Sequence, residues 1–209
     1  MPAIYVLAGD NGAGKSSIGG AAFRENGADY YNPDEFARAL RLRNPALNPA
    51  EANAIAWTNG VRLLERAIEQ RLDFAIESTL GGSTIPRLLG EAASRRIAVW
   101  IWYVGLATPE LHLARVRVRV ARGGHDIPEA DIRRRFEHSR INLIDLLPRL
   151  AALRVYDNSH EADPESGLMP APKLILSLEK RRILAPKDLR GSPDWAKPIV
   201  AAALRLSPR

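Results

Sequence analysis

Residues 9 to 17 read GDNGAGKSS and directly follow an apolar run, Ile4 to Ala8. They fit the spacing G-x-x-x-x-G-K-[ST] with Gly9, Gly14, Lys15 and Ser16. Glycines in such a loop allow its backbone N–H groups to fold around a polyphosphate, because no Cβ restricts the turn. The lysine of the pattern reaches the β- and γ-phosphates, and the hydroxyl after it can ligate Mg²⁺. The spacing therefore predicts a phosphate-binding loop between a strand and a helix.

This loop is expected to bind ATP, with Mg²⁺ as the accompanying ion. The predicted nucleotide contacts are Gly9, Asn11, Gly12, Ala13, Gly14, Lys15, Ser16 and Ser17. Ser16 is also the predicted metal ligand, and a helix from about Gly14 to Asn26 would direct its positive end at the anion. A glycine-rich turn without a ligand is the alternative, but it explains neither the lysine nor the hydroxyl.

A carboxylate follows the second predicted strand, at residues 29–31. Asn32 and Pro33 begin a predicted helix that runs to about Arg43, which places Asp34 in its first turn. A phosphotransferase needs a group that accepts the proton of the attacking hydroxyl, and Asp34 could supply it. Glu35 competes for this role. An acid that is favoured only by the helix dipole is the alternative.

Glu77 ends the third predicted strand, DFAIE at residues 73–77. At this place a carboxylate could hold a water bound to Mg²⁺ or a hydroxyl of the substrate. Ser78 and Thr79 add hydroxyl donors beside it. The alternative is a helix-capping or loop acid without further function.

Arginines gather between Arg115 and Arg135. The alternation RVRVRV at residues 115–120 could be read as a strand, but good capping signals and a shared apolar face favour a helix from about Thr108 to Gly123. A second helix is predicted from Pro128 to about Leu147. Mobile arginines can neutralise the charge on a transferring phosphoryl group, so the pair is predicted as an arginine-rich lid at about residues 109–147. Several of these arginines would only be solvated.

Strands alternate with helices along the chain, and further elements are expected at residues 49–70, 83–95, 97–104 and 153–157. The order predicts an α/β fold of the P-loop NTPase type, with a parallel sheet of about five strands flanked by helices on both faces. Lys173 to Leu178 is predicted as an edge strand and Pro193 onward as a weak helix. Residues 1–160 would form the core with its lid, and 161–209 an extension packed on it or partly flexible. Ligands of such sheets bind at the carboxyl ends of the strands.

The chain of 209 residues has no cysteine, which excludes disulfides and thiolate metal sites. Its net charge of +6 and pI near 10.0 are compatible with nucleic acid, an anionic membrane or a phosphate-rich substrate. No aromatic residues lie between the arginines at residues 115–135, which favours a phosphorylated small molecule over nucleic acid as the binding partner.

The apolar run from Ile97 to Ala107 is too short to span a bilayer, and no signal peptide fits before Ile4, so a cytoplasmic protein without membrane contact is expected.

The ordered set of motifs resembles the zeta toxin family, within it the compact zeta-like proteins often described as predicted ATPases. The matching stretches are AGDNGAGKSS (8–17), YNPDEFA (31–37), FAIESTLGG (74–82), RVRVARGGHDIPEADIRRRFEHS (117–139), NL (142–143) and YDNS (156–159). The resemblance implies an ATP-dependent small-molecule kinase. In the better known zeta toxins the acceptor is a UDP-N-acetyl amino sugar, phosphorylated on a sugar hydroxyl. An antitoxin protein is the partner that the resemblance implies.

The resemblance also implies roles for single residues. Lys15 and Ser16 would bind ATP and Mg²⁺, and Asp34 would be the general base. The implied substrate contacts are Asn32, Glu77, Thr79 and Arg122. Arg119 and Arg135 match the arginines that stabilise the transition state, with Arg122 as the reserve choice.

Two other functions remain open from the sequence. One is a nucleotide-dependent switch whose basic tail, residues 181–209, binds a protein or nucleic acid. The third strand lacks the hydrophobic run closed by Asp that switch ATPases use, which counts against it. The other is a nucleic-acid 5′-hydroxyl kinase, which shares the loop and the aspartate.

Overall fold

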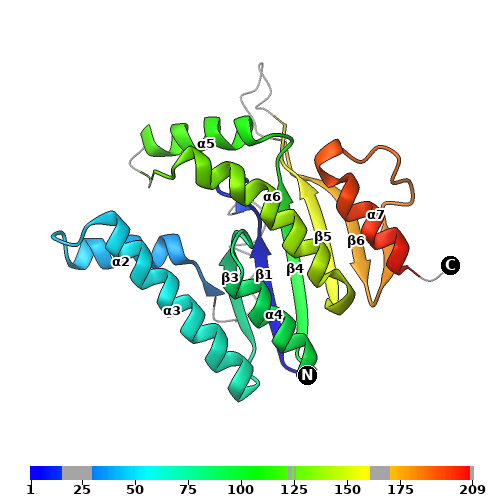
Figure 1. The fold of residues 1–209 in the computed structure, drawn as a ribbon, viewed down its shortest axis with the longest axis horizontal. Helices are drawn as coiled ribbons and strands as arrows, with labels where there is room; N and C mark the ends of the chain where they lie inside the picture. The colour runs from blue at the N-terminus through cyan, green and yellow to red at the C-terminus, as the bar shows by residue number, and fades with distance from the viewer. Residues whose placement is uncertain (16–29, 122–123, 125, 161–169, 208–209) are drawn as a thin grey trace.

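The computed structural model describes residues 1–15, 30–121, 124, 126–160 and 170–207. Its strands form one seven-stranded sheet in the order β2-β3-β1-β4-β5-β6-β7 (Figure 1). The strands are β1 (Ala3–Ala8), β2 (Tyr30–Tyr31), β3 (Phe74–Ser78), β4 (Ala98–Gly105), β5 (Ala152–Asp157), β6 (Lys173–Glu179) and β7 (Arg182–Ala185). Strands β1 to β5 pair in parallel, whereas β6 and β7 are antiparallel to their neighbours. The predicted parallel α/β sheet is confirmed, and two antiparallel strands extend it beyond the expected five.

The described helices lie close to the positions that the sequence predicted. They are α2 (Pro33–Arg43), α3 (Pro49–Gln70), α4 (Thr84–Ser94), α5 (Pro109–Ala121), α6 (Glu129–Leu146) and α7 (Lys197–Leu206), with short 3₁₀ turns η2 (Leu147–Arg149) and η3 (Asp194–Ala196). The RVRVRV stretch is helical, as its capping signals favoured. The helix predicted after the phosphate loop falls almost wholly on residues 16–29, outside the described part. None of the described helices is both long and apolar enough to cross a membrane.

The ends of α2 and α3 follow from their capping residues. Asn32 precedes α2 and its side-chain oxygen accepts hydrogen bonds from the first-turn backbone. Asn48 and Glu51 form a reciprocal capping box at the start of α3. Arg71 adopts a left-handed conformation with φ 54 and ends that helix. These residues therefore determine where α2 begins and where α3 begins and ends.

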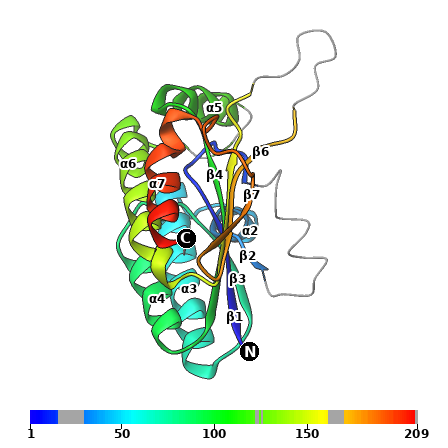
Figure 2. The same ribbon diagram turned by 90° about the vertical axis from the view of Figure 1, so that its right-hand side faces the viewer.

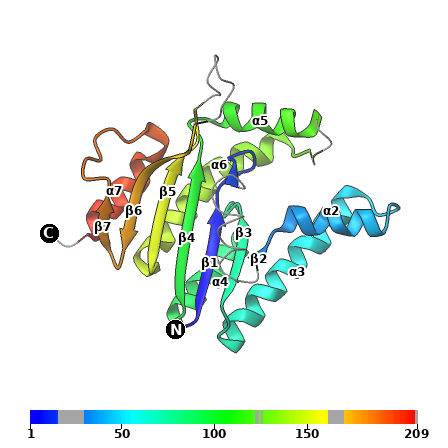
Figure 3. The ribbon, with the colours of Figure 1, turned by 180° about the vertical axis from the view of Figure 1, so that it is seen from behind.

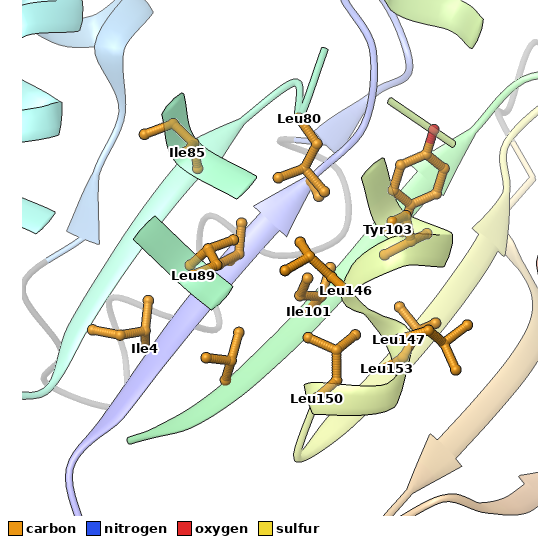
Figure 4. Packing of buried hydrophobic residues seen from close by; sticks show 14 of the residues in the cluster. Ile4, Leu80, Ile85, Leu89, Ile101, Tyr103, Leu146, Leu147, Leu150 and Leu153 are labelled. Carbon is orange, nitrogen blue, oxygen red and sulfur yellow. The ribbon is translucent and has the colours of Figure 1, made fainter. Parts of the chain in front are cut away.

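Figure 2 shows α3, α4, α6 and α7 together on one side of the sheet. The main core lies in this layer, where Ile4, Ile101 and Leu153 of the strands meet side chains of the helices (Figure 4). Helix α5 instead lies across the carboxyl ends of the strands (Figure 1). Helices were predicted on both faces of the sheet, and the candidate for the second layer, residues 14–26, lies almost wholly beyond the described residues. Among the described residues, the main core therefore packs one face of the sheet against one layer of helices. The carboxyl ends of the strands lie outside this core, where the candidate site is found.

The prediction of an edge strand at Lys173 to Leu178 is wrong. β6 lies between β5 and β7, and β7 forms the edge (Figure 3). Lys180 and Arg181 join the two strands, both with positive φ, 48 and 64. Two such residues are typical of a tight hairpin turn, but the Asn-Gly pair that would signal it in the sequence is absent here. The domain boundary near residue 160 stays a prediction, since it borders residues 161–169, which are not described.

Candidate active site

The loop after β1, which is predicted to bind phosphate, packs against β4 and α5. Gly9, Gly12 and Gly14 all have positive φ, at 136, 79 and 84. A Cβ on Gly9 would lie 2.1 Å from the carbonyl oxygen of Val104, so no other residue fits there. A Cβ on Gly12 would lie 3.3 Å from that of Arg115. The loop is therefore packed tightly against β4 and α5, which restricts its conformation.

Lys15 lies folded back over this loop. Its Nζ donates to the carbonyl oxygens of Gly9, at 2.9 Å, and Asp10, at 3.2 Å. It also lies 3.4 Å from Oε1 of Glu77, and the Lys15 side chain is 8% exposed. The ammonium group is thus held at the carboxyl end of β1, where its charge faces a carboxylate from β3.

Glu77 is fixed by two further groups from the second strand and the helix after it. Its Oε2 accepts hydrogen bonds from the Tyr30 hydroxyl, at 2.8 Å, and from Nδ2 of Asn32, at 3.0 Å. Oδ1 of Asn32 meanwhile accepts from the backbone N–H groups of Asp34 and Glu35. One amide side chain therefore orients both the Glu77 carboxylate and the first turn of α2, which carries Asp34.

Asp34 links α2 to α5 through an ion pair. Its Oδ2 lies 3.5 Å from a guanidinium nitrogen of Arg119, and the two side chains are 56% and 32% exposed. Exposed pairs of this kind contribute little to stability. Asp34 is therefore a solvent-exposed carboxylate, held beside one of the predicted transition-state arginines.

Arg135 reaches the phosphate loop from α6. It donates to Oδ1 of Asn11 at 2.8 Å. Its stem packs so closely on Gly81 that a Cβ there would lie 2.6 Å from Cγ of Arg135. Asn142, also on α6, donates to the carbonyl of Leu80 at 2.6 Å. Helix α6 thus connects the loop after β1 with the segment after β3.

Two cavities meet at Asp34. The first, of about 490 Å³, lies between the end of β3, α3 and α6, and its lining includes Lys15, Asp34, Trp57, Glu77, Thr79 and Arg135. The second, of about 560 Å³, lies between α2 and α5, and its lining includes Asp34, Arg38, Arg41, Arg115 and Arg119. One cavity therefore has a mixed apolar and polar wall, and the other is strongly basic.

A buried pair of titratable groups lies behind the loop. Burial raises the pKa of Asp10 from 3.8 to about 7, although Lys15, Arg140 and Arg135 oppose the shift. Burial also lowers the pKa of His112 from 6.5 to about 4. Between these values both side chains are neutral, so the 4.0 Å separation of His112 Nε2 from Asp10 Oδ2 is no ion pair there. Nδ1 of neutral His112 donates to the carbonyl of Asn11 at 2.8 Å, which ties the loop to α5.

Asn158, directly after β5, holds the loop from the other side. Its Nδ2 donates to the carbonyl of Ala13 at 2.8 Å. The contact makes it a support of the phosphate loop, through a hydrogen bond that no spacing rule predicts.

The structure brings most of the predicted site residues together at one edge of the sheet. Gly9 to Lys15, Asn32, Asp34, Glu77, Thr79, Arg119 and Arg135 all lie there. Ser16, Ser17 and Arg122 fall outside the described residues. Among the residues of the site that the sequence did not predict are Tyr30, Asp10, His112, Asn142 and Asn158. Of these, Asp10 had the clearest signal, because a carboxylate inside a phosphate loop must be neutralised or buried.

Comparison with known proteins identifies a family and several similar structures. The zeta toxin family model matches residues 1–163. An uncharacterized protein of Haemophilus influenzae is 32% identical over 129 residues, which are 61% of this chain and 88% of the relative. The structure of AvrRxo1-ORF1:-ORF2 with ATP has a TM-score of 0.68 and 15% identity, over 97% of this chain and 64% of that one.

A structure of the PezAT chromosomal toxin–antitoxin system of Streptococcus pneumoniae has a TM-score of 0.51 and 19% identity, over 75% of this chain and 68% of that one. At such identities the structural likeness shows a shared fold. The family model, in contrast, spans most of this sequence, including every motif of the site. The chain belongs to the zeta toxin family.

Proposed function

We propose that the protein is an ATP-dependent kinase that phosphorylates a hydroxyl group of a small molecule. The observation that carries this proposal is the first cavity, whose charged lining residues include Lys15, Asp34, Glu77 and Arg135. They come from different elements and converge at the edge where ligands of parallel sheets bind. A structural role for all four would not explain why they surround open space.

ATP fits the loop after β1. Its three glycines with positive φ allow the tight backbone that a polyphosphate site needs, and Lys15 Nζ lies at this loop, 3.4 Å from Oε1 of Glu77. Mg²⁺ in kinases is held mainly by phosphate oxygens and water, with one or two protein oxygens. Glu77 and the predicted ligand Ser16 suit that need. When bound, the ion would neutralise charge on the β- and γ-phosphates.

Asp34 is the proposed general base. The acceptor oxygen forms a bond to the γ-phosphorus, its proton passes to the Asp34 carboxylate, and the bond from the γ-phosphorus to the bridging oxygen breaks to release ADP. Asp34 borders both cavities, so it can face a donor on one side and an acceptor on the other. Its exposure in the first turn of α2 keeps it accessible to both.

Arg119 and Arg135 are the proposed transition-state arginines, with Arg122 as a reserve. Both described guanidinium groups lie at the cavities and contact other site residues, Asp34 and Asn11. Charge spreads over the equatorial oxygens of the transferring group, and fixed guanidinium donors stabilise it at little reorganisation cost. Asn11 would hold Arg135 ready for this step.

The acceptor proposed for testing first is a UDP-N-acetyl amino sugar. Trp57, which is 53% exposed at the first cavity, offers a flat apolar surface for a base or an acetyl group. Asn32, Glu77 and Thr79 offer hydrogen-bonding groups for sugar hydroxyls. An antitoxin-like protein is the proposed partner, supported by the toxin–antitoxin system named for the Streptococcus pneumoniae structure.

The proposal is tested by an acceptor screen. Purified protein and MgATP are incubated with UDP-sugars, nucleosides, aminoglycosides and short oligonucleotides, and products are read by ³¹P NMR and mass spectrometry. Asp34→Asn should lower turnover by about 10²- to 10⁴-fold, the usual contribution of a positioned base. Glu35→Gln, on the neighbouring acid, should retain turnover. A product on another panel member would keep the kinase and replace its acceptor, whereas unchanged transfer by Asp34→Asn would remove the base assignment.

A further inference from the structure

The C-terminal segment reaches the supports of the phosphate loop through Trp195. This residue lies in η3, just before α7, and is 5% exposed. It lies beyond residues 1–163, the part that the family model matches. Its ring covers the end of β4, where a Cβ on Gly105 would be 2.3 Å from Cη2 of the indole. Glycine at position 105 therefore leaves the space that the ring fills.

The indole N–H of Trp195 donates to Oδ1 of Asp157 at 3.2 Å. The same oxygen accepts from the backbone N–H of Ser159 at 3.2 Å and from the Ser159 hydroxyl. Asp157 is 8% exposed, so its carboxylate depends on these donors in place of water. The Asp157 carboxylate thus connects Trp195 to Ser159, so both chain neighbours of Asn158 are held in place.

Asn158 is held at its backbone on both flanks. Its N–H donates to the carbonyl of Gly105 at 3.0 Å, and its own carbonyl accepts from Arg115 at 2.8 Å. The side chain then donates to the carbonyl of Ala13. Because Asn158 is only 5% exposed, its amide has little freedom to turn elsewhere. The position of its backbone therefore decides where the Ala13 carbonyl is held.

We infer that Trp195 is a positioning residue for nucleotide binding, acting through Asp157 and Asn158 on the phosphate loop. The carbonyl and the N–H of a trans peptide point in opposite directions. Holding the carbonyl of Ala13 on one side therefore directs the N–H of Gly14 to the other, as a phosphate-binding backbone requires. This inference rests on the proposed role of the loop in binding ATP. It assigns a function to a segment outside the matched part of the chain.

The test measures the affinity of the full chain for a non-hydrolysable MgATP analogue by calorimetry. Trp195→Phe keeps a ring but removes the donor to Asp157, and it should raise Kd by about 3- to 10-fold, the size of a typical hydrogen bond, because Trp195 acts on the loop only through Asp157 and Asn158. Ile199→Ala is the matched control, because Ile199 is fully buried in α7 and belongs to the same core. It should lower Tm at least as much as Trp195→Phe and leave Kd within about twofold.

A double-mutant cycle with Asn158→Ala tests the route. If Trp195 acts through Asn158, Trp195→Phe should add less than about twofold to Kd once Asn158 is alanine. Additive effects, an unchanged Kd for Trp195→Phe, or equal loss of affinity in the Ile199→Ala control would each overturn the inference. A wild-type chain that binds no nucleotide would instead refute the proposed function itself.

Discussion

The ammonium group of Lys15 lies 3.4 Å from the carboxylate of Glu77, with both side chains largely withdrawn from solvent. Each group is therefore the counter-charge of the other. Polyphosphate bound in the loop would offer Lys15 a stronger anionic partner and would meet repulsion from Glu77. We therefore expect Glu77 to oppose nucleotide binding electrostatically unless a cation is bound beside it.

Glu77→Gln should separate binding from turnover. The amide oxygen can still accept from Tyr30 and Asn32, but the charge that holds Lys15 and repels phosphate is gone. We expect metal-free ATP to bind a few-fold more tightly, and kcat with MgATP to fall by about tenfold or more, since charged hydrogen-bonding groups contribute about 1.5–3 kcal/mol. Calorimetry and steady-state kinetics measure the two effects. Glu69→Gln, exposed near the far end of α3, is the control; a fall in ATP affinity for Glu77→Gln would contradict the repulsion argument.

Gly81→Ala should displace Arg135 together with the turn of α6 that carries it. The added Cβ would lie 2.6 Å from Cγ, 2.9 Å from Cβ and 3.2 Å from Cα of Arg135, whereas a Cβ added to the neighbouring Gly82 would have nothing within 4 Å. A misplacement of about 1 Å in a catalytic group can cost about 10²-fold in rate. We expect kcat to fall by about 10- to 100-fold for Gly81→Ala and to stay nearly unchanged for Gly82→Ala. Equal kinetics for the two variants would remove Arg135 from the transition state.

Arg119→Gln should lower kcat by about 10²-fold, as for the loss of one transition-state donor. Its ion pair with Asp34 is exposed, so Tm should change little. Arg117→Gln provides the control on the same helix, because Arg117 is exposed and lines neither cavity. Steady-state kinetics and thermal unfolding measured on both variants separate the catalytic role from general charge loss. Equal kcat values for the two variants would contradict it.

The sequence predicts those parts of the fold that depend on local patterns. Apolar residues at helical spacing predict the helix at residues 49–70 at its observed bounds. The β6–β7 hairpin was missed, because its turn uses Lys180 and Arg181 in a conformation that only tertiary pairing enforces. Apolar spacing can be seen within one segment of the sequence, whereas the pairing of β6 with β7 depends on contacts between segments.

The same division applies to the site. The sequence predicts Lys15, Asp34 and Glu77 as site residues because the first two follow predicted strands and the third ends one, and parallel strands bring their carboxyl ends together. The supports of these residues were missed. Asn158 reaches Ala13 across 145 positions of the sequence, and His112 reaches Asn11 across 101. Such contacts depend on how α5 and β5 pack, which no spacing within one segment records.

The titration of Asp10 gives a pH-dependent prediction. Its pKa is raised by burial to about 7, so the folded state keeps a proton that the unfolded chain releases near 3.8. The stability that this proton contributes is fully present below about pH 4 and is lost as pH rises to about 7. His112 acts in the opposite sense, because burial lowers its pKa to about 4: its contribution is present above pH 6.5 and is lost as pH falls toward 4. The two contributions largely cancel between pH 4 and 6.5.

Asp10→Asn removes one of these two titrations. The free energy of unfolding of the variant minus that of the wild type should therefore increase with pH from 4 to 8, by up to about 4 kcal/mol for a shift of about three pKa units. Urea unfolding at several pH values measures this difference. Asp188→Asn is the control, since Arg190 lowers the pKa of exposed Asp188 and the corresponding difference should be small and of opposite sign. A difference for Asp10→Asn that does not vary with pH would mean that Asp10 stays ionised behind the phosphate loop, with Lys15, Arg135 and Arg140 outweighing its burial.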